Sequence, residues 1–102
     1  MRKLLRRRRA GRATEVAVYR AASHVVAARQ GERTILLDAR RGRYFGVDDV
    51  GASIWRRLAQ GATLPELVTG LEEEYSAPRE TLERDATAFM ARLERAHLLV
   101  VG

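Results

Sequence analysis

Apolar and polar side chains alternate along the first half of the chain, which is the pattern of β-strands. Three strands are predicted from it, at residues 23–29, 33–39 and 43–47. Gly31 and Gly42 stand in the short connections, where a tight turn can need a positive φ that glycine adopts without strain. The pattern therefore predicts two successive hairpins, in which the third strand is short and leads directly into a helix.

The period changes at Asp48, where the first helix is predicted to begin. Val50, Ile54 and Leu58 recur every four residues, which is the spacing of one face of an amphipathic helix. The carboxylate of Asp48 suits an N-cap, because it can accept a hydrogen bond from the free amides of the first turn. Gly61 is predicted to end this helix at the C′ position.

Two more helices are predicted before the C-terminus. Thr63 and Glu66 have the spacing of a capping box, and Pro65 falls in the first turn of the second helix. Pro78 opens the third helix, which is predicted to run to about Ala96. The order of elements predicts an α+β fold of winged-helix-like outline, with a three-stranded antiparallel sheet followed by a three-helix bundle.

Charge divides this chain of 102 residues unevenly. Seven of the 19 basic residues lie within residues 1–12, where there is no acid, so the rest of the chain carries 12 basic and 13 acidic residues. Like charges at this density repel, and few apolar side chains accompany them. We therefore predict a disordered basic tail at residues 1–18 and a folded domain at residues 19–102. The alternative for the tail is an arm that contacts nucleic acid or a membrane surface.

Composition excludes several classes of protein. The chain has no Cys, so disulfides and thiol ligands are absent and a reducing cytoplasm is the predicted compartment. No apolar run approaches the roughly 20 residues that span a membrane. The basic start also lacks the apolar segment of a signal peptide. No metal-ligand spacing and no phosphate-binding glycine loop is found, so neither a metal nor a cofactor is predicted.

The side chains that could carry catalysis are few. A nucleophile would have to be Ser23, Ser53 or Ser76, assisted by His24 or His97. None of these serines stands in a nucleophile elbow or a glycine-rich loop. The two histidines are more typical of surface or packing positions, because an active site needs several convergent groups. We therefore predict that the protein is not an enzyme.

The winged-helix outline raises DNA binding as an alternative, in which the third helix would enter the major groove. The charges of that helix are balanced, and it has no Asn or Gln to read adenine. Its charged residues are Arg79, Arg84, Arg92 and Arg95 against Glu80, Glu83, Asp85 and Glu94. The sequence therefore argues against specific DNA binding, and only non-specific binding through the tail is expected.

An ordered set of residues over about positions 22–100 resembles the PqqD family, the RiPP recognition elements. The set comprises Tyr44–Phe45, Gly46–Val47–Asp48, Gly51, Ile54–Trp55, Asp85, Phe89, Leu93 and Leu98. Two positions depart from the family pattern. Asp48 stands where Asn is frequent, and both residues cap helices. His97 stands where a helix-ending Gly is common, which puts the C-terminal turn in doubt.

The resemblance implies a function in peptide binding. In this family the third strand is an open edge, and the leader peptide of a ribosomally made precursor adds to it as an antiparallel strand, in a groove beside the third helix. The resemblance then implies that the groove is walled by Arg43, Tyr44, Phe45 and Gly46 on the strand and by Leu82, Asp85, Phe89 and Met90 on the helix.

The resemblance also implies a partner enzyme. A small domain fused to no enzyme resembles the proteins of lasso peptide pathways that pass the precursor to a separate leader peptidase. The alternative is a PqqD-type partner of a radical-SAM enzyme in quinone-cofactor synthesis.

Two residues of the predicted groove allow two interpretations each. Gly46 either admits the close approach of the leader backbone or simply bends the strand. Asp85 either orients the groove and meets a polar group of the leader, or is a solvated acid paired with Arg92 or Arg84.

Overall fold

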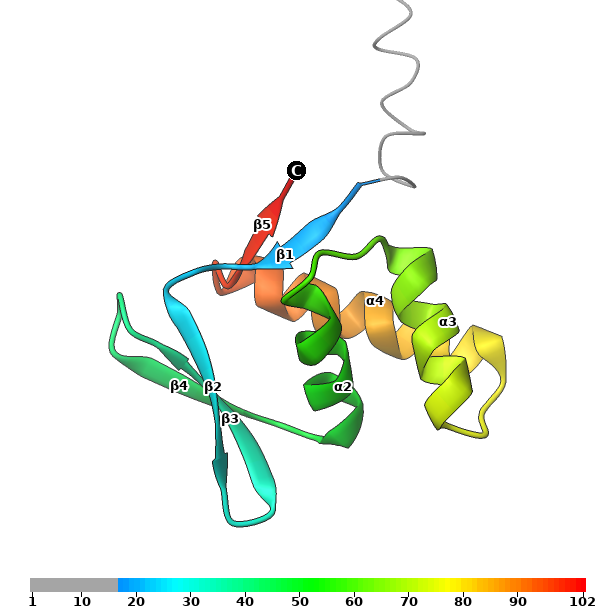
Figure 1. Cartoon of the computed structure of the whole chain (residues 1–102), viewed down its shortest axis with the longest axis horizontal. Coiled ribbons are helices and arrows are strands. Elements are labelled where there is room, and N and C mark those ends of the chain that lie inside the picture. The colour runs from blue at the N-terminus through cyan, green and yellow to red at the C-terminus, as the bar shows by residue number, and fades with distance from the viewer. Residues whose placement is uncertain (1–16) are drawn as a thin grey trace, which may run out of the picture.

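Four strands, three helices and a final strand follow one another along the chain (Figure 1). The structure is a computed structural model that describes residues 17–102. The predicted basic tail, apart from its last two residues, lies outside the described residues. The elements are β1 (Tyr19–Ala21), β2 (Val25–Gln30), β3 (Arg33–Asp38), β4 (Arg43–Val47), α2 (Asp49–Leu58), α3 (Leu64–Glu74), α4 (Arg79–Arg95) and β5 (Leu99–Val101).

The predicted three-stranded antiparallel sheet is confirmed, with the strand order β2-β3-β4. The strand at 43–47 has the predicted bounds, whereas the first strand begins two residues later than predicted, at Val25. Gly31 and Gly42 adopt φ of 67° and 65° in the two turns, as the hairpin prediction requires. Because β4 is the last strand in the order, one side of it has no neighbouring strand among the described residues.

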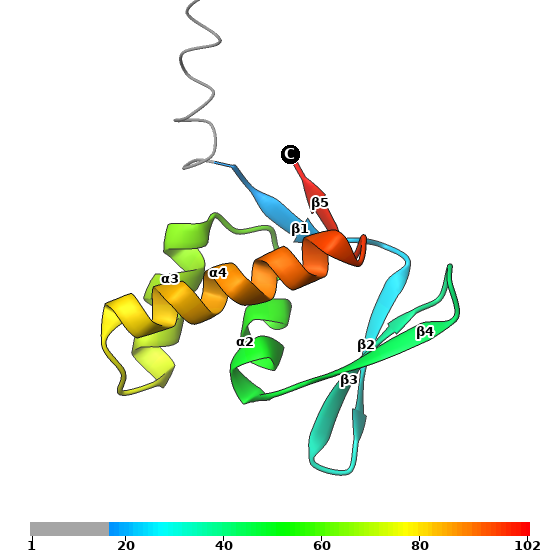
Figure 2. The same cartoon turned by 180° about the vertical axis from the view of Figure 1, so that it is seen from behind.

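The two faces of this sheet differ in burial. Leu36 and Val47 are buried on the face that packs on the helices. The opposite face carries Val26, Leu37 and Tyr44, which are in register across the three strands and are all exposed. Figures 1 and 2 show the sheet beside the helices, with α2 following directly from β4.

A second, two-stranded sheet pairs β1 with β5 and was not predicted from the sequence. Tyr19 pairs with Val101, and Tyr19 also bridges to Ala62 through two backbone hydrogen bonds of 2.8 and 3.0 Å. Each strand has only three residues, which is too short for alternation to be recognised. Their pairing depends on contacts between distant parts of the chain.

The predicted helix caps are largely confirmed. Asp48 Oδ1 accepts a hydrogen bond of 2.8 Å from the Gly51 amide, and both bonds of the Thr63–Glu66 capping box are present. The end of α2 differs from the prediction, because Ala59 is the C-cap and Gly61, with φ of 86°, lies two residues beyond it. The glycine therefore shapes the chain after the helix instead of taking the C′ position.

The end of α4 resolves the doubt about His97. His97 adopts φ of 62°, the left-handed region that glycine usually takes at a C′ position. Its amide donates to the Glu94 carbonyl at 3.1 Å, and the Leu98 amide donates to the Leu93 carbonyl at 2.9 Å. These two bonds are those of a Schellman motif. The helix therefore ends as it would with glycine, at the cost of a strained side-chain position.

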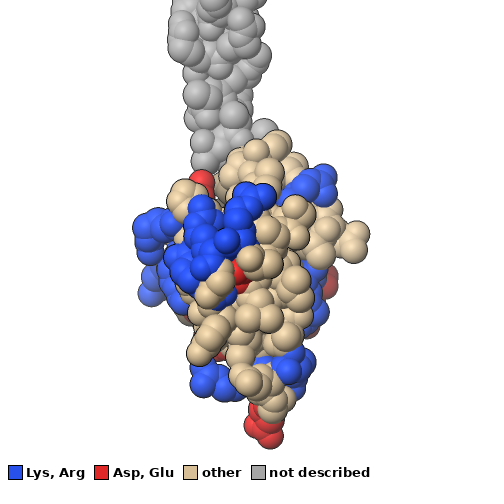
Figure 3. All heavy atoms as spheres, turned by 90° about the vertical axis from the view of Figure 1, so that its left-hand side faces the viewer, with Lys and Arg blue, Asp and Glu red and all other residues tan. Residues whose placement is uncertain are grey.

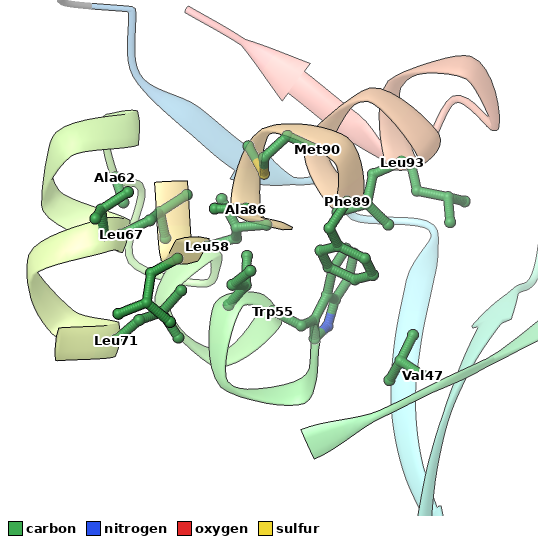
Figure 4. Close-up of a cluster of buried hydrophobic side chains, with 14 of the residues drawn as sticks. Val47, Trp55, Leu58, Ala62, Leu67, Leu71, Ala86, Phe89, Met90 and Leu93 are labelled. Carbon is green, nitrogen blue, oxygen red and sulfur yellow. The ribbon is translucent and has the colours of Figure 1, made fainter. Parts of the chain in front are cut away.

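Buried side chains from all three helices meet in one core (Figure 4). Phe89 on α4 lies near Trp55 on α2, and Val47 points from β4 toward both. Leu82 and Met90 belong to the same core, where they are 3% and 6% exposed. The core thus fixes α4 relative to β4, and the candidate site lies between these two elements.

Candidate peptide-binding groove

A groove runs between β4 and α4 and consists of two adjoining hollows. The Asp85 hollow, of about 490 Å³, is lined by Gly46, Val47, Asp48, Val50, Gly51, Asp85, Ala88, Phe89 and Arg92. The Leu93 hollow, of about 330 Å³, is lined by Leu36, Arg43, Phe45, Val47, Phe89, Arg92, Leu93, Arg95, Ala96 and Leu98. The two hollows adjoin, since Val47, Phe89 and Arg92 line both of them.

The floor of the groove is apolar. Phe45 and Val47 reach it from β4 and Phe89 from α4, and Phe89 is only 9% exposed. Gly51 permits this position of Phe89, because a Cβ atom built on Gly51 would lie 3.1 Å from the ring. A side chain there would force the ring to move. The floor therefore depends on close contact between the α2 backbone and an aromatic side chain of α4.

The β3–β4 turn determines which backbone groups of β4 face β3. The Gly42 amide donates to the Asp38 carbonyl at 2.9 Å, and Gly42 is left-handed. This bond closes the hairpin, so that Asp38 and its partner Arg43 form a hydrogen-bonded pair of the ladder. Antiparallel ladders alternate between hydrogen-bonded and non-hydrogen-bonded pairs from that point onward.

Within the part of the chain that the structure describes, the alternation leaves two residues of β4 with free backbone groups. Phe45, opposite Leu36, takes the next hydrogen-bonded position. Tyr44 and Gly46 take the non-hydrogen-bonded positions, so their N–H and C=O groups point away from β3 and toward the open edge. The edge beside the groove thus offers two donors and two acceptors, which is the requirement for adding another strand.

The side-chain space of Gly46 is occupied by part of the protein itself. A Cβ atom built on Gly46 would lie 2.7 Å from Nη2 of Arg33, on the adjacent strand β3. Absence of a side chain at this position therefore lets the Arg33 guanidinium lie over the strand. The sequence suggested two reasons for a glycine at position 46, a close approach of the leader backbone or a bend in the strand. The contact with Arg33 is a third reason.

Arg43 closes one end of the groove. Its Nη2 donates to Asp38 Oδ2 at 3.2 Å and to the Ala96 carbonyl at 3.1 Å, which ties the hairpin to the end of α4. The guanidinium also lies 5.2 Å from the centre of the Phe45 ring. This geometry is a cation–π contact that holds Phe45 against the groove.

Asp38 supports this end of the groove from beneath. Burial raises the pKa of its carboxyl group, but the Arg41 amide, the Arg43 guanidinium and the Arg40 amide together outweigh burial, so the pKa is lowered on balance. His24 Nε2 lies 3.7 Å from Asp38 Oδ1. The histidine thus contacts a structural carboxylate, whereas the Ser53 hydroxyl donates to Glu74.

The structure brings five of the predicted wall residues together. Arg43, Phe45, Gly46, Asp85 and Phe89 line the hollows. Helical spacing explains the α4 side of the groove. Ala88, Phe89 and Arg92 lie three, four and seven positions after Asp85, so they share one face of the helix with it.

Three predicted wall residues lie elsewhere. Tyr44 contributes its backbone to the edge, but its side chain is 71% exposed on the opposite face of the sheet, where alternation along the strand directs it. Leu82 and Met90 belong to the core and do not line either hollow, because the face of α4 that carries them is turned toward the other helices.

Eleven residues that sequence reasoning left out of the site line it in the structure. Val47 and Arg92 line both hollows, and Leu93 and Arg95 line the second one. Arg92 could have been found from the sequence, because it lies two helical turns after Asp85 and therefore on the same face of α4. Leu93 and Val47 were identified in the sequence only as core or motif residues.

Among residues 17–102 there is no group of three or more His, Cys, Asp or Glu side chains that could hold a metal ion. Within the same range, no helix is long and apolar enough to cross a membrane.

Comparison with known proteins identifies a family and two similar solved structures. The sequence model of the family described as Coenzyme PQQ synthesis protein D (PqqD) matches residues 33–99. The structure described as "TbiB1 in Complex with the TbiA(beta) Leader Peptide" is similar at 38% identity and a TM-score of 0.70, over 78% of this chain and 93% of that one. "Lasso peptide synthetase B1 complexed with the leader peptide" is similar at 28% identity and a TM-score of 0.70, over 80% and 96%. No curated protein sequence matches the chain.

Proposed function

The chain belongs to the PqqD family, and from that premise we propose that it binds the leader peptide of a ribosomally synthesised precursor without catalysing a reaction. The observation that carries the proposal is the open edge of β4 beside an apolar groove. Tyr44 and Gly46 present backbone groups there that have no partner among residues 17–102, and Phe45 and Phe89 form the floor. Both similar solved structures are described as complexes with a leader peptide.

The bound leader would form a fourth strand of the sheet, antiparallel to β4. Its hydrogen-bonded positions lie opposite Tyr44 and Gly46, and the side chains at those positions face the outer side of the sheet. Leader residues opposite Phe45 and Val47 face α4, because paired residues share a face. Two anchoring side chains, two residues apart, would therefore enter the two hollows.

Hydrogen bonds alone do not account for useful affinity. Each contributes roughly 0.5–1.5 kcal/mol net, and a micromolar complex requires about 8 kcal/mol. The two anchors supply further free energy, since full burial of an apolar side chain contributes roughly 1.5–3 kcal/mol. Specificity would then arise in the hollows, while the strand edge supplies generic affinity.

We further propose that the bound leader is handed to a separate enzyme, a lasso leader peptidase. Support comes from the second similar structure, which is described as lasso peptide synthetase B1 in complex with the leader peptide, and from the fact that the match covers 96% of that chain. The family description, a protein of coenzyme PQQ synthesis, keeps a radical-SAM partner as the second candidate.

The binding proposal is tested by titrating the protein with the leader segment of the precursor encoded beside its gene. Isothermal titration calorimetry is expected to show one site per chain. A scrambled leader of the same composition is the matched control and is expected to bind at least tenfold more weakly. Absence of binding at peptide concentrations up to the millimolar range would refute the proposal.

Reconstitution distinguishes the two candidate partner enzymes. Each purified enzyme is mixed with its precursor, with and without this protein. A lasso leader peptidase is expected to cleave its precursor faster when the protein is present. Stimulation of the radical-SAM enzyme alone would make quinone-cofactor synthesis the better assignment.

A further inference from the structure

The charged side chains are unevenly distributed along the groove. The Asp85 hollow has two carboxylates, Asp48 and Asp85, and one guanidinium group, that of Arg92, which it shares with the Leu93 hollow. Among residues 17–102, the Leu93 hollow is lined by no carboxylate and by three guanidinium groups, those of Arg43, Arg92 and Arg95. Figure 3, viewed from the side of the β3–β4 turn, shows a large group of Arg side chains on this face, with smaller groups elsewhere on it.

Most of this charge is not balanced within the domain. Arg43 is paired with Asp38 at 3.2 Å. Within residues 17–102, by contrast, no carboxylate lies within 4.0 Å of a guanidinium nitrogen of Arg92 or Arg95, and Asp85 has no basic partner at that distance. The interpretation of Asp85 as an acid paired with Arg92 therefore does not describe this structure. Both ends of the groove retain charge that a ligand can neutralise.

Strand geometry places one leader side chain at the basic end. An antiparallel strand that pairs with β4 passes Val47 first, then Phe45 and finally Arg43. Residues opposite these three positions all face α4, because they are two apart. The side chain opposite Arg43 therefore follows the second anchor by two residues and enters the region between Arg43 and Arg95.

We propose that the groove recognises a leader with an acidic side chain two residues after its second apolar anchor. The pattern is apolar, any residue, apolar, any residue, Asp or Glu, and it rests on the proposed function. The charges also select the direction of the strand. A parallel leader would bring the same acid beside Asp48 and Asp85, where like charges repel.

The test reverses one charge in the protein and one in the peptide. Arg95→Glu changes the basic end and leaves the apolar floor intact, since Arg95 is exposed and makes no ion pair within the described residues. Arg84→Glu is the matched control, because Arg84 is an exposed arginine of the same helix that lines neither hollow. The peptides are the precursor leader and a variant in which the acid of the pattern is replaced by Lys.

Arg95→Glu is expected to weaken binding of the unmodified leader about fivefold or more, and Arg84→Glu to change it by less than about twofold. The Lys-substituted leader is expected to bind Arg95→Glu better than it binds the wild type. Raising the ionic strength from about 0.1 M to about 1 M shortens the screening length from about 10 Å to about 3 Å, so it should reduce the difference between wild type and Arg95→Glu.

Each outcome distinguishes the inference from the function on which it rests. If the leader binds wild type and Arg95→Glu equally, the charge pattern is wrong and leader binding stands. If the leader does not bind the wild type, the proposed function fails. If Arg95→Glu lowers affinity for a duplex DNA probe and leaves leader affinity unchanged, the basic end serves nucleic acid and the inference is overturned.

Discussion

Replacement of Gly46 by proline tests whether the leader pairs with β4. The amide of Gly46 points toward the open edge, so Gly46→Pro removes a donor that the β3–β4 ladder does not use. Proline is tolerated on edge strands for this reason, and the variant is expected to remain folded. Its ring would occupy the position of the lost hydrogen, where the leader carbonyl must approach.

The magnitude follows from one lost hydrogen bond and one steric contact. The net bond contributes roughly 0.5–1.5 kcal/mol. The ring carbon adds a further cost, because it moves the leader away from the edge. We expect affinity to fall about tenfold or more, which corresponds to about 1.4 kcal/mol.

Gly46→Ala is the matched control. Its Cβ meets the same neighbour, Nη2 of Arg33 at 2.7 Å, as a proline Cβ would. That neighbour is the tip of a flexible side chain and can move at little cost. Alanine retains the amide donor, so its affinity for the leader is expected to stay within about twofold of wild type.

Calorimetric titration with the leader measures both variants, and circular dichroism establishes that each is folded. A folded Gly46→Pro variant with wild-type affinity would show that the leader does not pair with β4 at this position. Equal losses in the proline and alanine variants would attribute the effect to Arg33 displacement instead of the missing donor.

Three other variants test the groove and its support. Asp85→Ala is expected to weaken leader binding by about tenfold, or about 1.4 kcal/mol. The control, Glu83→Ala, lies on the same helix outside the hollows and should leave the affinity unchanged. Equal leader affinities of Asp85→Ala and wild type would exclude Asp85 from the site. His97→Gly is expected to raise the free energy of unfolding by about 0.5–1 kcal/mol, because glycine adopts the left-handed conformation of this position without strain. A lower free energy of unfolding in urea would contradict this. The pKa of Asp38 is lower in the folded than in the unfolded state, so the free energy of unfolding should fall as the pH drops from about 4 through the folded pKa. Asp38→Asn should flatten this part of the stability curve, and an unchanged pH dependence would show that Asp38 is not responsible.

Local signals predicted the elements that depend on neighbouring residues. Asp48 and Thr63 could be identified as caps because their partners lie three residues away. The turn glycines, Gly31 and Gly42, were likewise visible in the sequence. In each case the energetic reason for the structure is contained in a few consecutive residues.

Features that depend on tertiary packing could not be predicted in the same way. The pairing of β1 with β5 joins residues about 80 positions apart, and neither strand has a pattern of its own. Helical spacing placed Leu82 and Asp85 near one flank, but only the packing of α4 shows that Leu82 enters the core while Asp85 lines the groove. The orientation of a helix about its own axis is a property of the assembled core.

The resemblance to the PqqD family placed the predicted site between β4 and α4, where the structure has two hollows, but not all of the predicted wall residues line them. Tyr44 was expected among the walls, but its side chain lies on the opposite face of the sheet and only its backbone adjoins the groove. Alternation along the strand already implied this division, since Phe45 and Tyr44 must face opposite sides of the sheet. The charge separation along α4 required the structure, because it depends on which arginines lack partners.

Amide hydrogen exchange of β4, followed by NMR with and without the leader, tests the central claim most directly. The amide of Phe45 belongs to the β3–β4 ladder and is expected to be protected in both states. The amides of Tyr44 and Gly46 face the open edge, so they are expected to exchange rapidly in the free protein and slowly once the leader is bound. If the leader saturates the protein and these two amides still exchange as they do in its absence, strand addition to β4 is contradicted.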